Sequence, residues 1–225
     1  MKFLNGFKKI SGDASFRKFY RSKKKKSIIV IAYKEKTKNL LIYDAINKIL
    51  IKNNIIAPKL LNQNYYKNFI EIEDLGNQTI YQMLKKRDKD QYQIFKKIIK
   101  TLNKIQLVKD KKIKNFKNQS YKIEDYKNKF LLDEAKLFNV WYAKKKLSQK
   151  KLKLFNTKFN KEIKFLLSKL NYKNNTFVHR DFHVSNLIIT SKNQIGLIDN
   201  QDALIGNKAY DLASLIDDVR YKTSN

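Results

Sequence analysis

The chain has 225 residues, of which 42% are hydrophobic, so it can bury a substantial core as one domain or as two lobes. It contains no Cys, which excludes disulfides and thiolate metal sites. Its formal net charge of +30 raises the question of an anionic partner, but only five of the 50 basic residues are Arg. A coding bias toward Lys, Asn and Ile would give the same composition, so we expect no specific nucleic-acid partner.

No apolar run approaches the roughly 20 residues that cross a bilayer, and residues 1–7 lack a signal-peptide stretch. We therefore expect a cytoplasmic protein with no membrane partner. Scattered Lys side chains would still raise the local concentration of an anionic nucleotide.

The first third of the chain predicts an antiparallel β-unit followed by a helix. Strands are expected at 7–10, 16–20 and 27–33, with turn-forming residues at 11–15. Apolar residues at helical spacing predict a helix at 39–52, and the lone Pro58 follows it. Residues 68–76 are expected to form an edge strand that ends in a Gly turn.

From 79 to 170 the pattern is helical, with a Lys-rich connection at 110–120. The apolar stripe from Leu152 to Leu170 is expected to face the core. Trp141 is expected to pack in the core as well.

The segment 176–203 carries the chemistry. Its runs predict strand, polar loop, strand, turn and strand, with Asp181 and Asn186 in the loop and Asp199 at the end of the last strand. Asp181 suits a base that accepts a hydroxyl proton, and the oxygens of Asn186 and Asp199 suit a hard cation such as Mg²⁺. A base plus two metal-holding oxygens is what phosphoryl transfer requires. The alternative is a solvated loop that carries these residues by chance.

The spacing His179-x-Asp181-x-x-x-x-Asn186, followed by Asp199, resembles the core of the protein-kinase-like superfamily. His183, two residues after Asp181, is typical of its aminoglycoside phosphotransferase and choline kinase branch. Further stretches resemble the bacterial anomeric sugar kinases that act on N-acetylmuramate and N-acetylglucosamine: Gly12–Arg17, Ala57-Pro58, Glu73–Gly76, Glu134–Tyr142, Asp199–Ala203 and Tyr210–Leu215.

This resemblance implies an α+β, two-lobed protein-kinase-like fold with a small β-rich N-lobe (1–76) and a mostly helical C-lobe (77–225). It also implies ATP and Mg²⁺ as cofactors. Nucleotide contacts are expected from Ser15, Arg17, Lys34, Glu73 and Leu75, with Lys34 ranked above Arg17. Acceptor contacts are expected from Glu134, Asp202 and His183.

Two departures from the family pattern stand out. Asn200 replaces the Phe that usually follows the metal-binding Asp, and the chain stops soon after Arg220, where family members continue into further helices. We therefore expect the C-terminal helices that enclose an acceptor to be missing. The predicted function is ATP-dependent phosphorylation of a hydroxyl on an amino sugar. The alternatives are an inactive nucleotide-binding or scaffold protein of the same fold, or a basic nucleic-acid binder. The sequence does not fix the acceptor, the oligomeric state or the preference between ATP and GTP.

Overall fold

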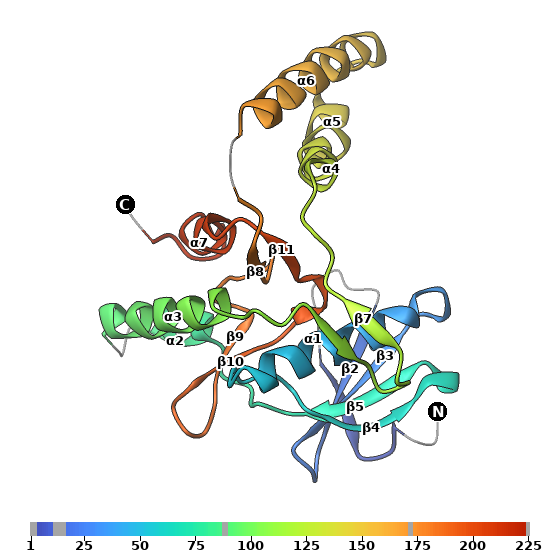
Figure 1. Cartoon of the computed structure of the whole chain (residues 1–225), viewed down its shortest axis with the longest axis vertical. Helices are drawn as coiled ribbons and strands as arrows, with labels where there is room; N and C mark the ends of the chain where they lie inside the picture. Colours follow the sequence, from blue (N-terminus) through green and yellow to red (C-terminus); the bar gives the residue numbers. More distant parts are fainter. Residues whose placement is uncertain (1–3, 11–16, 87–89, 171–172, 224–225) are drawn as a thin grey trace.

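A computed structural model describes residues 4–10, 17–86, 90–170 and 173–223. Its N-terminal part is a five-stranded antiparallel sheet in the order β1-β2-β3-β5-β4 (Figure 1). The strands are β1 (Phe7–Ile10), β2 (Arg17–Ser22), β3 (Ser27–Ala32), β4 (Leu60–Asn64) and β5 (Phe69–Glu73). The β-branched run in β3 suits its central place, where it pairs with β2 on one side and β5 on the other.

The strand predicted at 68–76 forms as β5, but the prediction that it lies at the edge of the sheet is wrong. β5 lies between β3 and β4, and β4 forms the edge. The sequence of β4, Leu-Leu-Asn-Gln-Asn, has no apolar alternation and so gave no strand signal.

Helix α1 (Lys38–Lys52) connects two hydrophobic cores. Leu40 and Tyr43 pack with Val30 and Ile70 under the sheet. The second half of α1, which includes Ile46, belongs to the larger core of the helical part. Because one helix is buried at both ends, it fixes the sheet relative to the residues that follow it.

The helical part consists of α2 (Ile80–Lys86), α3 (Gln91–Gln106), α4 (Asn128–Phe138), a π-helical turn (Asn139–Ala143), α5 (Lys144–Lys146), α6 (Gln149–Lys169) and α7 (Ala209–Ile216). Three short antiparallel pairs join them: β6 (Lys112–Lys114) with β7 (Ser120–Lys122), β8 (Thr176–Val178) with β11 (Leu204–Gly206), and β9 (Leu187–Ile189) with β10 (Ile195–Leu197). The predicted strand, loop, strand, turn, strand order of 176–203 is confirmed.

Residues 128–169 form a helical arm that projects from the rest of the chain (Figure 1). The expectation that the Leu152–Leu170 stripe faces the core is wrong, because α6 buries none of its residues. Its rings pack instead within the arm, where Phe159 stacks on Phe138 at 6.0 Å between centroids. Trp141 is 66% exposed, so its expected core position is also wrong.

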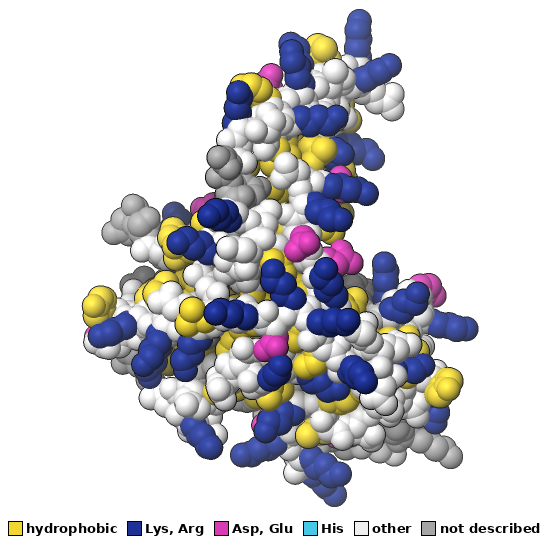
Figure 2. All heavy atoms as spheres, in the orientation of Figure 1, with side chains coloured by type: hydrophobic (Ala, Val, Ile, Leu, Met, Phe, Trp, Pro, Cys, Tyr) yellow, Lys and Arg dark blue, Asp and Glu magenta, His cyan; other side chains and the backbone are white. Residues whose placement is uncertain are grey.

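Within the described ranges, no helix has the length and apolar character to span a membrane. Lys and Arg side chains are scattered over the face in Figure 2, from the sheet to the helical arm. This even spread agrees with a compositional origin of the positive charge.

Candidate active site

Asp181 lies in the loop between β8 and β9, and its carboxylate is held from two sides. Asn186 Nδ2 donates to Asp181 Oδ2 at 2.9 Å, and His183 Nε2 lies 3.0 Å from Asp181 Oδ1. His183 Nδ1 accepts the Ser185 N–H at 3.3 Å, so the ring carries its proton on Nε2 and donates it to Asp181. The His183 hydrogen bond lowers the pKa of Asp181 to about 2, although burial opposes it.

Asn186 directly precedes β9 and Asp199 follows β10, so the two residues lie close in space although they are 13 positions apart. Ile198 N donates to Asn186 O at 3.1 Å, which places Asp199 one residue from that contact. The antiparallel pairing of β9 with β10 explains this neighbourhood. Asn186 Nδ2 is engaged by Asp181, so its amide oxygen is the atom left to bind a cation.

Backbone strain marks the same two loops. Among the described residues, six non-glycine residues have positive φ, and four of them are Asn, which tolerates this region. The other two are Arg180 (φ 71°) and Asp199 (φ 63°). Such conformations cost about 1–3 kcal/mol each and concentrate at functional sites.

Asp211 of α7 holds the start of the loop between β8 and β9, which is the predicted catalytic loop. Its carboxylate accepts the His179 N–H at 2.8 Å and the Arg180 N–H at 3.0 Å, and the residue is only 2% exposed. Burial raises the pKa of Asp211, and the two backbone donors oppose that rise.

Arg17, rather than Lys34, reaches Asp199. Arg17 Nη2 lies 2.8 Å from Asp199 Oδ1 and Arg17 Nη1 lies 3.4 Å from Asn39 Oδ1. β3 ends at Ala32, so Lys34 starts a 3₁₀ turn (Lys34–Lys36) and is exposed. Of these two expected nucleotide contacts, Arg17 is therefore the one that lies beside Asp199.

Two of the remaining nucleotide expectations, Glu73 and Leu75, lie at the end of β5 and just after it. Asp74 N donates to Lys26 O at 3.0 Å, whereas Leu75 N donates to no acceptor within the described chain. Glu73 and Leu75 line a groove of about 960 Å³ whose other walls are α3 and the β9–β10 turn. Ser15 lies outside the described residues.

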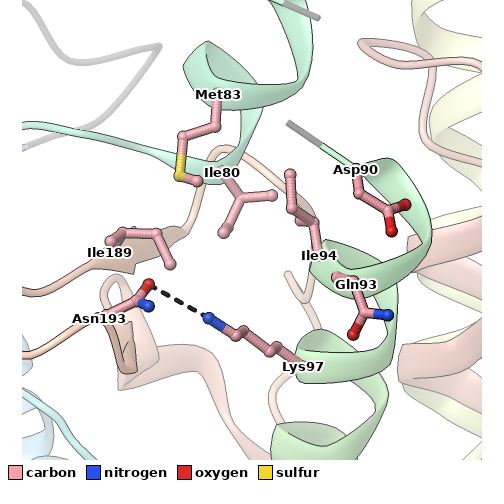
Figure 3. A pocket seen from close by; sticks show the side chains of 8 residues that line it. All are labelled: Ile80, Met83, Asp90, Gln93, Ile94, Lys97, Ile189 and Asn193. Carbon is pink, nitrogen blue, oxygen red and sulfur yellow. Dashed lines mark hydrogen bonds between the residues drawn. The ribbon is translucent and has the colours of Figure 1, made fainter. Parts of the chain in front are cut away.

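Neither that groove nor the smaller cavity in Figure 3 is lined by Asp181, Asn186 or Asp199. The smaller one, of about 260 Å³, lies between α2, α3 and the β9–β10 turn, where Lys97 Nζ donates to Asn193 Oδ1 at 3.2 Å. The structure thus brings the loops of Asp181, Asn186 and Asp199 together, but these residues do not line the groove of the Glu73–Leu75 segment.

A model of the phosphotransferase enzyme family matches residues 6–224. The chain belongs to this family. The family assignment agrees with the Asp181, Asn186 and Asp199 geometry and with the resemblance of the sequence motifs.

Two curated relatives of this chain are N-acetylmuramate/N-acetylglucosamine kinases. That of Neisseria meningitidis serogroup B is 26% identical over 93% of the chain and 60% of the relative, and that of Pseudomonas putida is 25% identical over 93% and 58%. The chain therefore spans about 60% of the length of the relatives it matches.

Solved structures with the same fold include the gentamicin complex of the aminoglycoside phosphotransferase APH(2″)-IIa, with a TM-score of 0.66, 17% identity, and coverage of 97% of this chain and 72% of that one. The choline kinase LicA from Streptococcus pneumoniae has a TM-score of 0.61, 13% identity, and coverage of 93% and 68%. The predicted two-lobed protein-kinase-like fold is confirmed.

In this chain, the Glu134 carboxylate lies at the centre of a polar cluster beside the loop that carries Asp181. Glu134 Oε1 pairs with Arg180 Nη2, and Tyr126 Oη and Tyr210 Oη donate to Glu134 Oε2. Burial, together with the Glu134 hydrogen bond, raises the pKa of Tyr126, so its phenol stays a donor. Asp202 joins the cluster through its main-chain oxygen, which lies 3.4 Å from Arg180 Nη1.

Sequence reasoning missed Arg180 and Tyr126. Arg180 stood inside the recognised motif between His179 and Asp181, so its position was a usable signal. Tyr126 is one of 13 tyrosines and follows a polar stretch, so nothing in its surroundings distinguished it.

Proposed function

We propose that the chain transfers the γ-phosphoryl group of ATP to a hydroxyl of an amino sugar of the N-acetylmuramate or N-acetylglucosamine type. The observation that carries the proposal is the Asp181 carboxylate, which His183 and Asn186 hold, together with the bond from Ile198 N to Asn186 O that brings Asp199 toward Asn186. The family match supports phosphoryl transfer, and the names of the curated relatives support the acceptor class.

In this reaction the acceptor oxygen bonds to the γ-phosphorus while the bond from that phosphorus to the β–γ bridging oxygen breaks. The acceptor proton moves to Asp181, and ADP leaves. A carboxylate with a pKa near 2 is a weak base, but in a loose transition state the hydroxyl needs orientation more than early deprotonation. His183 and Asn186 keep the carboxylate oriented for that purpose, so we assign His183 to Asp181 rather than to the acceptor.

Asn186 Oδ1 and the Asp199 carboxylate would hold Mg²⁺, since both offer the oxygen ligands that this ion prefers. Bound there, the ion would neutralise charge on the β- and γ-phosphates. Among the described residues, no three His, Cys, Asp or Glu side chains gather as a metal cage. A site with few protein ligands suits Mg²⁺, because in kinases one or two carboxylates bind this ion together with substrate phosphates and water.

Arg17 would contact the phosphates from the sheet side. Its guanidinium is nearly buried, with 4% of the side chain exposed, so a phosphate that reaches it meets a desolvated charge. Of the other nucleotide expectations, Glu73 and Leu75 remain proposals for the adenine, with the Leu75 N–H available as a donor.

Glu134 and Asp202 are proposed to bind the acceptor beside Asp181. Arg180 connects Glu134 to the base, because its guanidinium pairs with Glu134 and Asp181 is the next residue in the chain. The sugar would thus be held next to the loop that presents the base, with Arg180 as the link between Glu134 and that loop.

The test is to incubate the chain with Mg-ATP and single acceptors and to identify products by ³¹P NMR and mass spectrometry. We expect a sugar phosphate from N-acetylglucosamine or N-acetylmuramate and none from choline or an aminoglycoside. Transfer to choline alone would overturn the acceptor class. ATP binding without transfer to any acceptor would instead support an inactive nucleotide-binding protein.

A further inference from the structure

A chain of hydrogen bonds runs through the buried interior from the catalytic loop to helix α1. Asp181 N donates to His179 Nδ1 at 3.3 Å, and His179 Nε2 lies 2.8 Å from Asn200 Oδ1. Asn200 Nδ2 donates to Asn47 Oδ1 at 2.8 Å, and Asn47 Nδ2 donates to Pro58 O at 3.1 Å. The three side chains in this path are 0%, 0% and 3% exposed for His179, Asn200 and Asn47.

Every donor in this path faces an acceptor, and the direction is the same throughout. Because His179 Nδ1 accepts the Asp181 N–H, the ring proton lies on Nε2 and points at the Asn200 oxygen. That orientation turns the Asn200 amide nitrogen toward Asn47, where a second acceptor, Leu197 O, lies 3.2 Å away. Reversing any one amide would set like atoms against each other.

Bulk apolar packing does not explain these amides. A buried amide is costly unless its hydrogen bonds are made, and an apolar side chain of the same size would fill the space. The neighbouring residues Ile46 and Leu197 are fully buried and apolar, as is usual for such a core. A fully satisfied polar network in this setting specifies one geometry.

The path reaches the backbone of Asp181 and the residue that directly follows Asp199. His179 accepts from the backbone of Asp181, and Asn200 directly follows the strained Asp199. At its other end, α1 also carries Asn39, the second partner of Arg17.

We propose that Asn200 and Asn47 are positioning residues that lock helix α1 to the catalytic loop and so keep Asp181 and Asp199 in register for transfer. This inference rests on the proposed phosphotransferase function. Here the hydrogen bonds of Asn200 perform the task that a packed aromatic ring would perform in the family pattern.

The test uses the double variant Asn47→Leu/Asn200→Leu, which replaces the amide pair by an apolar pair of similar shape. The single variant Asn47→Leu serves as a second, milder change. The matched control is Asn139→Leu, because Asn139 is also buried but its side-chain oxygen has no hydrogen-bond partner. Two quantities are measured: kcat and KM for sugar phosphorylation, and hydrogen exchange of the backbone amides at 179–182.

We expect kcat to fall tenfold or more in the double variant and less in Asn47→Leu, with KM for ATP within twofold of the wild type. Exchange at 179–182 should become at least tenfold faster in both, and neither quantity should change in the control. A variant that is folded, keeps the wild-type kcat and shows wild-type exchange would overturn the proposal. If the double variant does not fold, the same two readouts on Asn47→Leu decide.

The exchange measurement needs no turnover, so it separates this inference from the proposed function. A wild type that transfers no phosphate would refute the function alone. Unchanged exchange in the variants would refute the positioning role alone.

Discussion

Replacing Asp211 by Asn removes the charged acceptor on which the catalytic loop begins. In the wild type the two carboxylate oxygens accept the N–H groups of His179 and Arg180 at 2.8 and 3.0 Å. An Asn side chain keeps one oxygen but turns an NH₂ group toward the second N–H. One hydrogen bond is lost, and a buried donor faces another donor.

A hydrogen bond to a charged group contributes about 1.5–3 kcal/mol, and a buried donor without a partner costs about 1–3 kcal/mol. Against this, burial raises the pKa of Asp211, so the neutral Asn escapes part of the cost of burying a charge. We therefore expect a net loss of about 2–3 kcal/mol in the free energy of unfolding. For a chain of this size that corresponds to a fall of about 5–10 °C in Tm.

The assay is thermal unfolding followed by circular dichroism, together with the rate of sugar phosphorylation at a temperature where the variant is folded. Asp217→Asn is the matched control, because Asp217 lies at the exposed end of the same helix. We expect activity to fall in Asp211→Asn beyond any unfolded fraction, since Arg180 would lose its fixed backbone. Equal Tm values for the two variants would refute this reasoning.

Three further outcomes follow from the structure. Arg17→Ala should weaken ATP binding about 30-fold in a calorimetric titration, since a charge-assisted contact contributes about 2 kcal/mol. Because His183 holds the pKa of Asp181 near 2, below its unfolded value of about 3.9, this carboxylate stabilises the fold fully above about pH 4 and loses that effect as pH falls to 2. Between about pH 5 and 2, the free energy of unfolding of Asp181→Asn should therefore fall by about 1 kcal/mol less than that of the wild type, as measured by urea unfolding. This figure is already reduced because the Asp181 side chain is half exposed. Gly206→Ala should cost about 1–3 kcal/mol in the same assay, because its Cβ would lie 3.1 Å from the ring of buried Tyr126.

Each of these has a result that contradicts it. Wild-type ATP affinity in Arg17→Ala would remove Arg17 from the phosphate site. Parallel acid denaturation of Asp181→Asn and the wild type would mean that His183 does not hold the carboxylate. An unchanged unfolding midpoint in Gly206→Ala would show that Tyr126 moves aside at no cost.

The order of strands and loops in 176–203 could be predicted because its signals are local. Strand patterns on both sides of a short polar loop place Asp181, Asn186 and Asp199 on neighbouring turns, and the structure has these strands. Helix α1 was predictable for the same reason, since its apolar spacing suits both cores.

The parts that failed depend on contacts between distant segments. The periodicity of α6 predicts a helix, but it does not say that the helix packs only within the helical arm. The hydrogen bond from Asn200 to Asn47 joins residues 153 positions apart, which no local pattern reveals.

The most direct test of the account is the rate of sugar-phosphate formation by Asp181→Asn compared with Asp217→Asn, with ATP affinity measured in parallel. If Asp181 is the base in a site shared with Asn186 and Asp199, the rate falls about a hundredfold or more while ATP binds within twofold of the wild type. A wild-type rate in Asp181→Asn, with active wild-type protein beside it, would contradict the account.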